Sequence, residues 1–224
     1  MSQRAVASVP LAAVTSYLKV FGLTNRLISG TVRASVIYKP HSNGCFNPVL
    51  THVQIANMYA KEYVLKNRAI KQQQQQTNYE STNKGAFVII KRHKRHFSNF
   101  PDVLNIFHKL ANRTNREVVV FEDGHLPSFN DTLDLFYRAD VVMGAHGAGM
   151  SNILVSRPGT TVIEVFCKGK EMRMCYRLLA LRLGMRYFAS ETTDAEVTWR
   201  CEESGIRVDI EELETVLDYV ATYL

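Results

Sequence analysis

VVMGAHGAGMSNILVSRPGTTVIEVF, residues 141–166, is the stretch that decides the predicted fold. Its two ends, 141–143 and 161–166, are apolar runs of the kind found in strands that are buried on both faces. Between them a glycine-rich turn leads into 150–155, which has the pattern of a short helix. Two such strands joined by a helical crossover are parallel strands of one sheet.

The same alternation of strand and helix extends outward from this stretch. It begins after Gly85, where the chain becomes rich in apolar runs. The other expected strands are 86–90 and 118–121, and the other expected helices are 101–111, 131–137, 172–183 and, after the capping residue Asp209, 210–220. The sequence therefore predicts an α/β domain with a doubly wound parallel sheet, Rossmann-like, behind a partial N-terminal segment.

Three segments are expected along the chain. Residues 1–70 have a mixed pattern with a helical stretch at 52–66, and residues 85–224 form the α/β domain. Between them, 71–84 contains five consecutive glutamines and almost no apolar residue. It is expected to be an exposed loop, or an extension of the preceding helix over its first few residues. An uncharged stretch near the N-terminus is too short to span a membrane and is expected to form a helix, with a degenerate signal peptide as the alternative.

Composition and charge narrow the classes of function. The chain has 224 residues, 46% hydrophobic and 21% charged, which excludes collagen-like, fully disordered and polytopic membrane proteins. Its net charge is +6, and one hexapeptide with Lys91, Arg92, Lys94 and Arg95 supplies most of it. Such a local cluster favours an anion-binding site. It also resembles a nucleic-acid patch, but it lacks interleaved aromatic residues, so no nucleic-acid partner is expected.

Neither a zinc site nor a magnesium site is expected. The four cysteines have no Cys-x-x-Cys spacing, and no Asp-x-Asp pair occurs in the chain. Buried thiols are the simplest interpretation of the cysteines, although their even number also permits disulfides. A nucleotide-sugar site in this chain would therefore rely on arginines and a helix terminus to stabilise the leaving group.

The glycine-rich turn at 144–149 is the first candidate site. It follows a strand and opens a helix, so its backbone N–H groups and the helix dipole can face an anion. The alternative is a tight turn that needs glycine only for its backbone conformation, with its histidine as a hydrogen-bonded turn residue. The residues expected to bind there are His146, Gly147, Ala148, Gly149 and Ser151.

Glu164 and the basic hexapeptide complete the candidate site. Glu164 lies inside an apolar strand, where a carboxylate is costly unless it is paired or hydrogen-bonded. It can accept two sugar hydroxyls, or it can belong to a structural ion pair. Arg92 and Arg95 directly follow the strand 86–90, which places them at the carboxyl edge of the sheet, on the side of the glycine-rich turn.

Four spaced motifs resemble glycosyltransferase family 61, which includes the lumenal EGF-domain O-linked N-acetylglucosamine transferase. DVVMGAHGAGMSN at 140–152 and PGTTVIEVF at 158–166 are similar to its HGAG loop and its P-G-x-x-V-x-E-x-F signature. Arg92 with RHFSN at 95–99 is similar to its R…R-x-x-x-N element, and 176–185 is similar to a Y-x-x-L-A…L-G segment. The resemblance runs from about residue 86 to the C-terminus.

This resemblance implies the second, donor-binding half of a GT-B enzyme at 85–224, with 1–70 as a remnant of the acceptor-side domain and a linking helix. Arg92, Arg95 and the backbone of 147–151 would face the diphosphate of a UDP-sugar, and Asn99 belongs to the same arginine element. Glu164 would hold the ribose, and Asp123 lies in a loop that would be near the base.

The implied reaction is inverting, metal-independent transfer of a sugar, N-acetylglucosamine in the animal enzymes, to a hydroxyl of a protein or glycan. No cofactor is implied, and the implied location is the lumen of the ER or Golgi. The chain is shorter than two complete α/β domains, and no general base is assigned in it.

Two other functions are compatible with the motifs. The first is a truncated, catalytically inactive module that binds UDP. The second is an NAD-binding Rossmann protein, although the turn lacks the third glycine of G-x-G-x-x-G and follows a late strand of the alternation.

Overall fold

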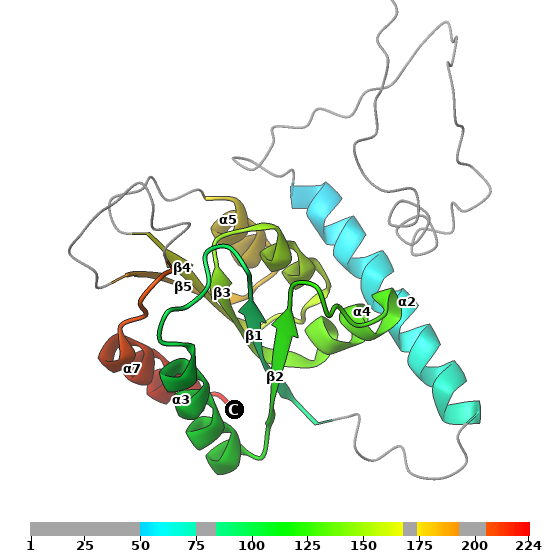
Figure 1. The fold of residues 1–224 in the computed structure, drawn as a ribbon. Helices are drawn as coiled ribbons and strands as arrows, with labels where there is room; N and C mark the ends of the chain where they lie inside the picture. Colours follow the sequence, from blue (N-terminus) through cyan, green and yellow to red (C-terminus); the bar gives the residue numbers. More distant parts are fainter. Residues whose placement is uncertain (1–49, 75–83, 168–173, 193–204) are drawn as a thin grey trace, which may run out of the picture.

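The computed structural model describes residues 50–74, 84–167, 174–192 and 205–224, which form a parallel sheet covered by helices on both faces (Figure 1). The predicted doubly wound α/β fold is confirmed. The strands are β1 Ala86–Lys91, β2 Glu117–Glu122, β3 Ala139–Ala145, β4 Thr161–Phe166 and β5 Arg186–Glu191. No helix in these four ranges is long and apolar enough to cross a bilayer.

The order of the strands fixes where a ligand can bind. The sheet runs β2-β1-β3-β4-β5, and each neighbouring pair is parallel. The chain therefore reverses its direction of travel across the sheet between β1 and β3, where Ile90 pairs with Gly144. Open α/β sheets bind ligands outside the carboxyl ends of the strands at this reversal. The segments that follow β1 and β3 emerge there side by side.

Helices α3 (Phe100–Thr114) and α7 (Ile210–Ala221) cover one face of the sheet (Figure 1). α3 has Pro101 in its first turn, and the left-handed residue Asn115 ends it. Its buried Phe107 meets Phe87 of β1 edge to face, with ring centroids 6.1 Å apart. Apolar residues at helical spacing therefore bury this face, as the sequence predicted.

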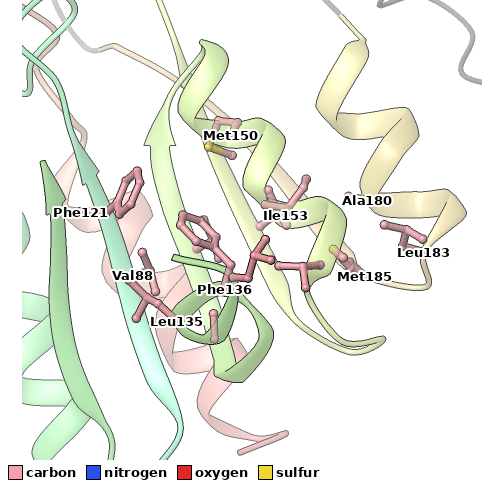
Figure 2. Packing of buried hydrophobic residues seen from close by; sticks show 14 of the residues in the cluster. Val88, Phe121, Leu135, Phe136, Met150, Ile153, Ala180, Leu183 and Met185 are labelled. Atoms are coloured by element: carbon pink, nitrogen blue, oxygen red, sulfur yellow. The ribbon is translucent and has the colours of Figure 1, made fainter. Parts of the chain in front are cut away.

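The opposite face is covered by α2 (Leu50–Gln74), α4 (Phe129–Arg138), the 3₁₀ helix η4 (Ala148–Val155) and α5 (Cys175–Arg182). Figure 2 shows Phe121 of β2 against Phe136 of α4, whose ring centroids are 5.2 Å apart. The same view shows Met150 and Ile153 of η4 in this core, and both are fully buried. The buried side chains of Met150 and Ile153 thus anchor η4, the segment after β3, to the core. The sequence predicted a short helix at 150–155, and the structure has a 3₁₀ helix there that begins two residues earlier.

Helix α2 is attached to the α/β domain by apolar and polar contacts. Val53 and Val64 join its core, and Asn57 Nδ2 donates to the carbonyl of Leu154 at 2.5 Å. α2 continues through Gln74, so the first residues of the expected loop 71–84 extend the helix, the alternative that the sequence left open. Residues 1–49 and 75–83 lie outside the described residues, and with them the expectations for the N-terminal stretch.

Strand β5 was not expected from the sequence. Its sequence, RYFASE, has a charged residue at each end, and most of it is only half-buried because β5 is an edge strand. β2 is an edge strand too, but its apolar run at 118–121 is continuous, whereas Ala189 and Ser190 interrupt the run in β5.

Candidate functional site

Two arginines and the glycine-rich turn meet where β1 and β3 end. Arg92 Nη1 donates to the carbonyl oxygen of His146 at 3.0 Å, and Arg95 Nη1 donates to the same oxygen at 2.6 Å. The two side chains come from the segment after β1, and the carbonyl belongs to the residue that follows β3. The structure therefore brings together these residues at the edge where the sequence placed them.

The arginines are poorly neutralised. The oxygen that they share is a neutral carbonyl, and the one carboxylate near them in the described residues is Asp123, whose Oδ2 lies 3.6 Å from Arg92 Nε. Asp123 is 41% exposed, and an ion pair of that length and exposure is weak. Two guanidinium charges with one weakly paired carboxylate between them make this edge attractive to an anion.

Arg95 is held in an unfavourable backbone conformation. Its φ of 58° lies in the left-handed region, which costs a residue other than glycine about 1–2 kcal/mol. Its hydrogen bond to His146 is the interaction that the structure shows for this side chain. Backbone strain of this kind concentrates at functional sites, which agrees with a binding role for the segment.

The glycines of the turn are required by close approach. A Cβ atom on Gly147 would lie 1.9 Å from Arg92 Nη1, and one on Gly149 would lie 3.0 Å from Ile90 Cγ2. η4 begins immediately afterwards at Ala148, and the N–H groups of a helix's first turn have no partner within the helix. A phosphate can approach this backbone closely, because no side chain from the two glycines is in the way.

Ser151 opens the second turn of η4 and is exposed. Its hydroxyl donates to the carbonyl of Ala148 at 2.6 Å, so its proton is used within the helix. The oxygen of the hydroxyl remains an acceptor. A direct bond from Ser151 to an anion would require this hydroxyl to rotate.

Glu164 is buried and engaged on both oxygens. Its side chain is 0% exposed; Oε1 lies 2.5 Å from His146 Nδ1, and Oε2 accepts the Tyr187 hydroxyl at 2.6 Å. Burial, reinforced by Glu164, raises the pKa of Tyr187 above its ordinary value, so the phenol keeps its proton and donates it. The sequence allowed two roles for Glu164, a structural ion pair or a contact to two sugar hydroxyls. The geometry fits the structural pair better, because both carboxylate oxygens already have partners.

The imidazole of His146 is fixed on three sides. It stacks against Phe166 with centroids 5.5 Å apart, lies 5.4 Å from the ring of Tyr176, and meets Glu164 at Nδ1. Nε2 has no hydrogen-bond partner among the described residues and is not one of their buried unpaired atoms, so it reaches solvent. The His146–Glu164–Tyr187 arrangement was missed from the sequence. The parallel register that pairs Gly144 with Glu164 is the signal that could have found it.

Asn99 does not face this edge. It is buried, and its amide uses both of its polar atoms on Val208: Nδ2 donates to the carbonyl and Oδ1 accepts from the N–H, each at 3.0 Å. Ser98 N donates to Ile206 O, and Ile206 N donates to His96 O. In place of the substrate contact expected for it, Asn99 ties the arginine segment to residues 206–208.

Within the described residues, no group of three or more His, Cys, Asp or Glu side chains is arranged to hold a metal ion. Cys167 forms a disulfide, which the cysteine count permitted, and Cys175 is buried. The glycine turn follows β3 and not the first strand of the sheet, so the NAD-binding alternative is not favoured.

Solved structures with some likeness to the chain are distant. A diflavin flavoprotein A3 from Nostoc sp. is 12% identical, with 62% of this chain and 90% of that chain covered and a TM-score of 0.42. A mutant flavo di-iron protein from Thermotoga maritima is 13% identical, with 86% and 57% covered and a TM-score of 0.40. The lysine decarboxylase LdcF of Francisella novicida is 10% identical, with 62% and 17% covered and a TM-score of 0.39. TM-scores this low support no functional argument.

No curated protein matches the chain by sequence. The model of the family Glycosyltransferase 61 matches residues 33–163, more than half of the chain. The match includes Arg92, Arg95 and the glycine turn and ends one residue before Glu164. It starts and stops earlier than the motif resemblance, which began near residue 86 and ran to the C-terminus. The chain therefore belongs to the Glycosyltransferase 61 family.

Proposed function

We propose that this chain binds a UDP-sugar and transfers the sugar to a hydroxyl of a protein or glycan acceptor, with inversion and without a metal ion. Family membership implies glycosyltransferase activity. The observation that carries the donor proposal is the convergence of Arg92 and Arg95 on the His146 carbonyl. In this proposal residues 85–224 are the donor-binding half of a GT-B enzyme.

A diphosphate matches the unused donors at this edge. Each guanidinium has five N–H groups, and the structure shows one nitrogen of each donating to His146. The remaining N–H groups can bind phosphate oxygens in a bidentate manner. Backbone N–H groups at Ala148 and Gly149, in the first turn of η4, add donors beside them.

The same donors supply the stabilisation that transfer requires. As the bond between the sugar and the diphosphate breaks, negative charge develops on the leaving phosphate. Fixed guanidinium groups and a helix N-terminus stabilise that charge without reorganisation, which is the role of a metal ion in other transferases. Arg92 and Arg95 therefore act on the leaving group in this proposal.

Asp123 is the better candidate for the nucleoside. It follows β2, at the same edge of the sheet, and its carboxylate is accessible, whereas that of Glu164 is buried and doubly bonded. An exposed carboxylate can accept hydrogen bonds from two ribose hydroxyls. We therefore assign the ribose contact to Asp123.

The disulfide at Cys167 supports an oxidising compartment, since cytosolic thiols are kept reduced. The lumen of the ER or Golgi is such a compartment. The acceptor proposed there is a hydroxyl of a secreted protein or of its glycan, and N-acetylglucosamine is the sugar proposed from the motif resemblance.

The test is calorimetric titration of the chain with UDP in the presence of a chelator. We expect metal-independent binding that weakens about 10- to 100-fold in Arg95→Ala, the loss typical of a charge-assisted hydrogen bond. Lys94→Ala is the matched control, because Lys94 is an exposed cation one residue away with no ion pair among the described residues. It should change the affinity less than about twofold.

Two results would contradict the proposal. One is a folded chain that binds no UDP. The other is an equal loss of affinity in Arg95→Ala and Lys94→Ala, which would indicate general attraction between a basic segment and an anion. Turnover is then measured as UDP released from UDP-N-acetylglucosamine in the presence of acceptor glycoproteins.

A further inference from the structure

The Glycosyltransferase 61 fold of this chain maintains a carboxylate, Glu164, in the centre of its sheet, where burial of a charge is expensive. Its two hydrogen bonds reach the half-buried Tyr187 and His146, whose other ring nitrogen reaches solvent. We propose that His146 is the proton donor to the leaving phosphate of the donor sugar, and that Glu164 and Tyr187 are its positioning residues. This inference rests on the proposed use of a UDP-sugar.

The geometry indicates which nitrogen of His146 would donate the proton to the leaving phosphate. Nδ1 lies 2.5 Å from Glu164 Oε1, so it is the nitrogen that donates to the carboxylate. The Tyr187 hydroxyl occupies the other oxygen and prevents the carboxylate from turning away. Nε2, on the opposite side of the ring, is left for a ligand. A carboxylate that orients an imidazole in this way also stabilises the imidazolium.

The place of His146 in the chain puts it beside the leaving group. Its carbonyl binds the two arginines, and the residues that follow it in the turn carry the backbone N–H groups proposed to bind the phosphate. In an inverting displacement the acceptor hydroxyl approaches the anomeric carbon from the side opposite the departing oxygen. A group built into the phosphate-binding turn is therefore on the side of the leaving phosphate and not on that of the acceptor.

The proposed step is balanced as follows. The bond between the anomeric carbon and the phosphate oxygen breaks, and its electron pair stays on that oxygen, which takes the proton from Nε2. The acceptor oxygen forms the new bond to the anomeric carbon and releases its proton to water. The imidazole is left neutral, with Nδ1–H still donating to Glu164, and it takes up a proton from water when the next donor sugar binds.

Charged and titratable groups surround His146 from several elements. Arg92 and Arg95 lie at its carbonyl, Glu164 and Tyr187 on the Nδ1 side, and Tyr176 beside the ring. A diphosphate placed at Nε2 adds negative charge, so donor binding should draw a proton onto the imidazole.

This proton uptake is the test. UDP-N-acetylglucosamine is titrated calorimetrically in buffers of different ionisation enthalpy, over the neutral pH range. The diphosphate of an intact nucleotide sugar has no proton to lose there, so uptake reports on the protein. We expect uptake of part of a proton in the wild type, none in His146→Gln, and unchanged uptake in His108→Gln, an exposed histidine of α3.

The positioning residues are tested by the pH profile. Glu164→Gln removes the charge that favours the imidazolium, so maximal uptake should move to lower pH. Tyr187→Phe removes a donor from the carboxylate and should move it to higher pH, and this variant retains the aromatic ring. A merely structural role would lower affinity or stability in both variants without moving the profile.

The outcomes separate this inference from the proposed function. If neither UDP nor UDP-N-acetylglucosamine binds the wild type, the donor site itself is wrong. If UDP alone binds, the same comparison is made with UDP, since the ligand's own titration cancels between wild type and His146→Gln. Donor binding without uptake, or uptake that persists in His146→Gln, overturns the role of His146 and leaves the donor site standing.

Discussion

Arginines have opposite roles at the two ends of the strands, the edge of the sheet where the strands begin and the edge where they end. At the edge where the strands begin, Asp140 binds Arg116 through one oxygen at 2.9 Å and Arg157 through the other at 3.0 Å. At the edge where the strands end, Arg92 and Arg95 converge on a carbonyl oxygen. The first pair is matched with a carboxylate and stabilises the fold. The second pair is left with charge to spare, which is what an anion site requires.

Other contacts strengthen this contrast. At the beginning of the sheet, Arg138 is paired with Glu117, and Arg68 of α2 donates to Asp134 of α4 at 2.5 Å. Arg68 also lies over the ring of Tyr137, 5.1 Å from its centroid. Sequence alone gives each of these arginines the same chemical identity as Arg95. Their partners give them different roles.

The largest loss of stability is expected from substitution of Glu164, the buried carboxylate near the ends of the strands. Glu164 is fully buried, and Glu164→Ala leaves its two part-buried partners, His146 Nδ1 and the Tyr187 hydroxyl, without an acceptor. Removal of one partner from such a buried group costs about 3–5 kcal/mol of unfolding free energy. Urea denaturation followed by circular dichroism measures it. Glu122→Ala, at an exposed carboxylate paired with Lys91, is the control and should barely move the midpoint.

A smaller loss of stability is expected at Asp140, where the strands begin. Asp140→Ala removes the partner of Arg116 and Arg157, which are part-exposed, and should cost about 1–3 kcal/mol. UDP affinity should stay unchanged, because the contact lies at the opposite end of the strands. Arg95→Ala should show the reverse pattern. If Asp140→Ala weakened UDP binding as much as Arg95→Ala, the division between the two edges would be wrong.

The glycine turn offers a sharper test of anion binding at the edge where the strands end. In Gly147→Ala the new Cβ must displace the Arg92 guanidinium, since it would lie 1.9 Å from Nη1. We expect UDP affinity to fall about 3- to 10-fold, with the fold intact because a guanidinium can move aside. Combined with Arg92→Gln, the substitution should cause little further loss. Additive losses would mean that Gly147 acts independently of Arg92.

The smallest effect concerns an exposed contact between α2 and α4. The Ser128 hydroxyl and, second, Lys71 hold the pKa of Asp131 below its ordinary value. A pKa lower in the folded state means that the contribution to stability is present at neutral pH and is lost as pH falls through that pKa. Asp131→Asn should therefore cost about 0.5 kcal/mol near neutrality and nothing in strong acid. An equal cost at both pH values, by urea denaturation, would contradict this origin.

Much of the fold was predictable because the central strands of a parallel sheet are buried on both faces. β1 and β4 have the continuous apolar runs that such burial demands. β5 was not predictable, because Ala189 and Ser190 interrupt its apolar run and charged residues stand at both of its ends. β2 lies at the other edge of the sheet and also has charged ends, but its continuous run at 118–121 was sufficient to predict it.

Part of the candidate site was also predictable from the sequence, and part was not. The meeting of Arg92 and Arg95 with the glycine turn followed from strand ends, which need only the order of elements. The pairing of His146 with Glu164 needed the register of β3 against β4. The engagement of Asn99 with Val208 joins residues 109 positions apart, and no local pattern indicates it.

The link between residues 96–99 and residues 206–208 also has a consequence for synthesis. The arginine segment is translated well before the C-terminal stretch to which it is tied. A nascent chain that ends before residue 206 already contains both arginines and both glycines, yet it lacks the backbone that pairs with Phe97. Because chains fold from the N-terminus as they are made, the sheet can assemble first and the arginine segment only at the end. A premature stop codon just before residue 206 would therefore remove the backbone that ties the arginine segment in place, while it spares Arg92, Arg95 and the glycine turn.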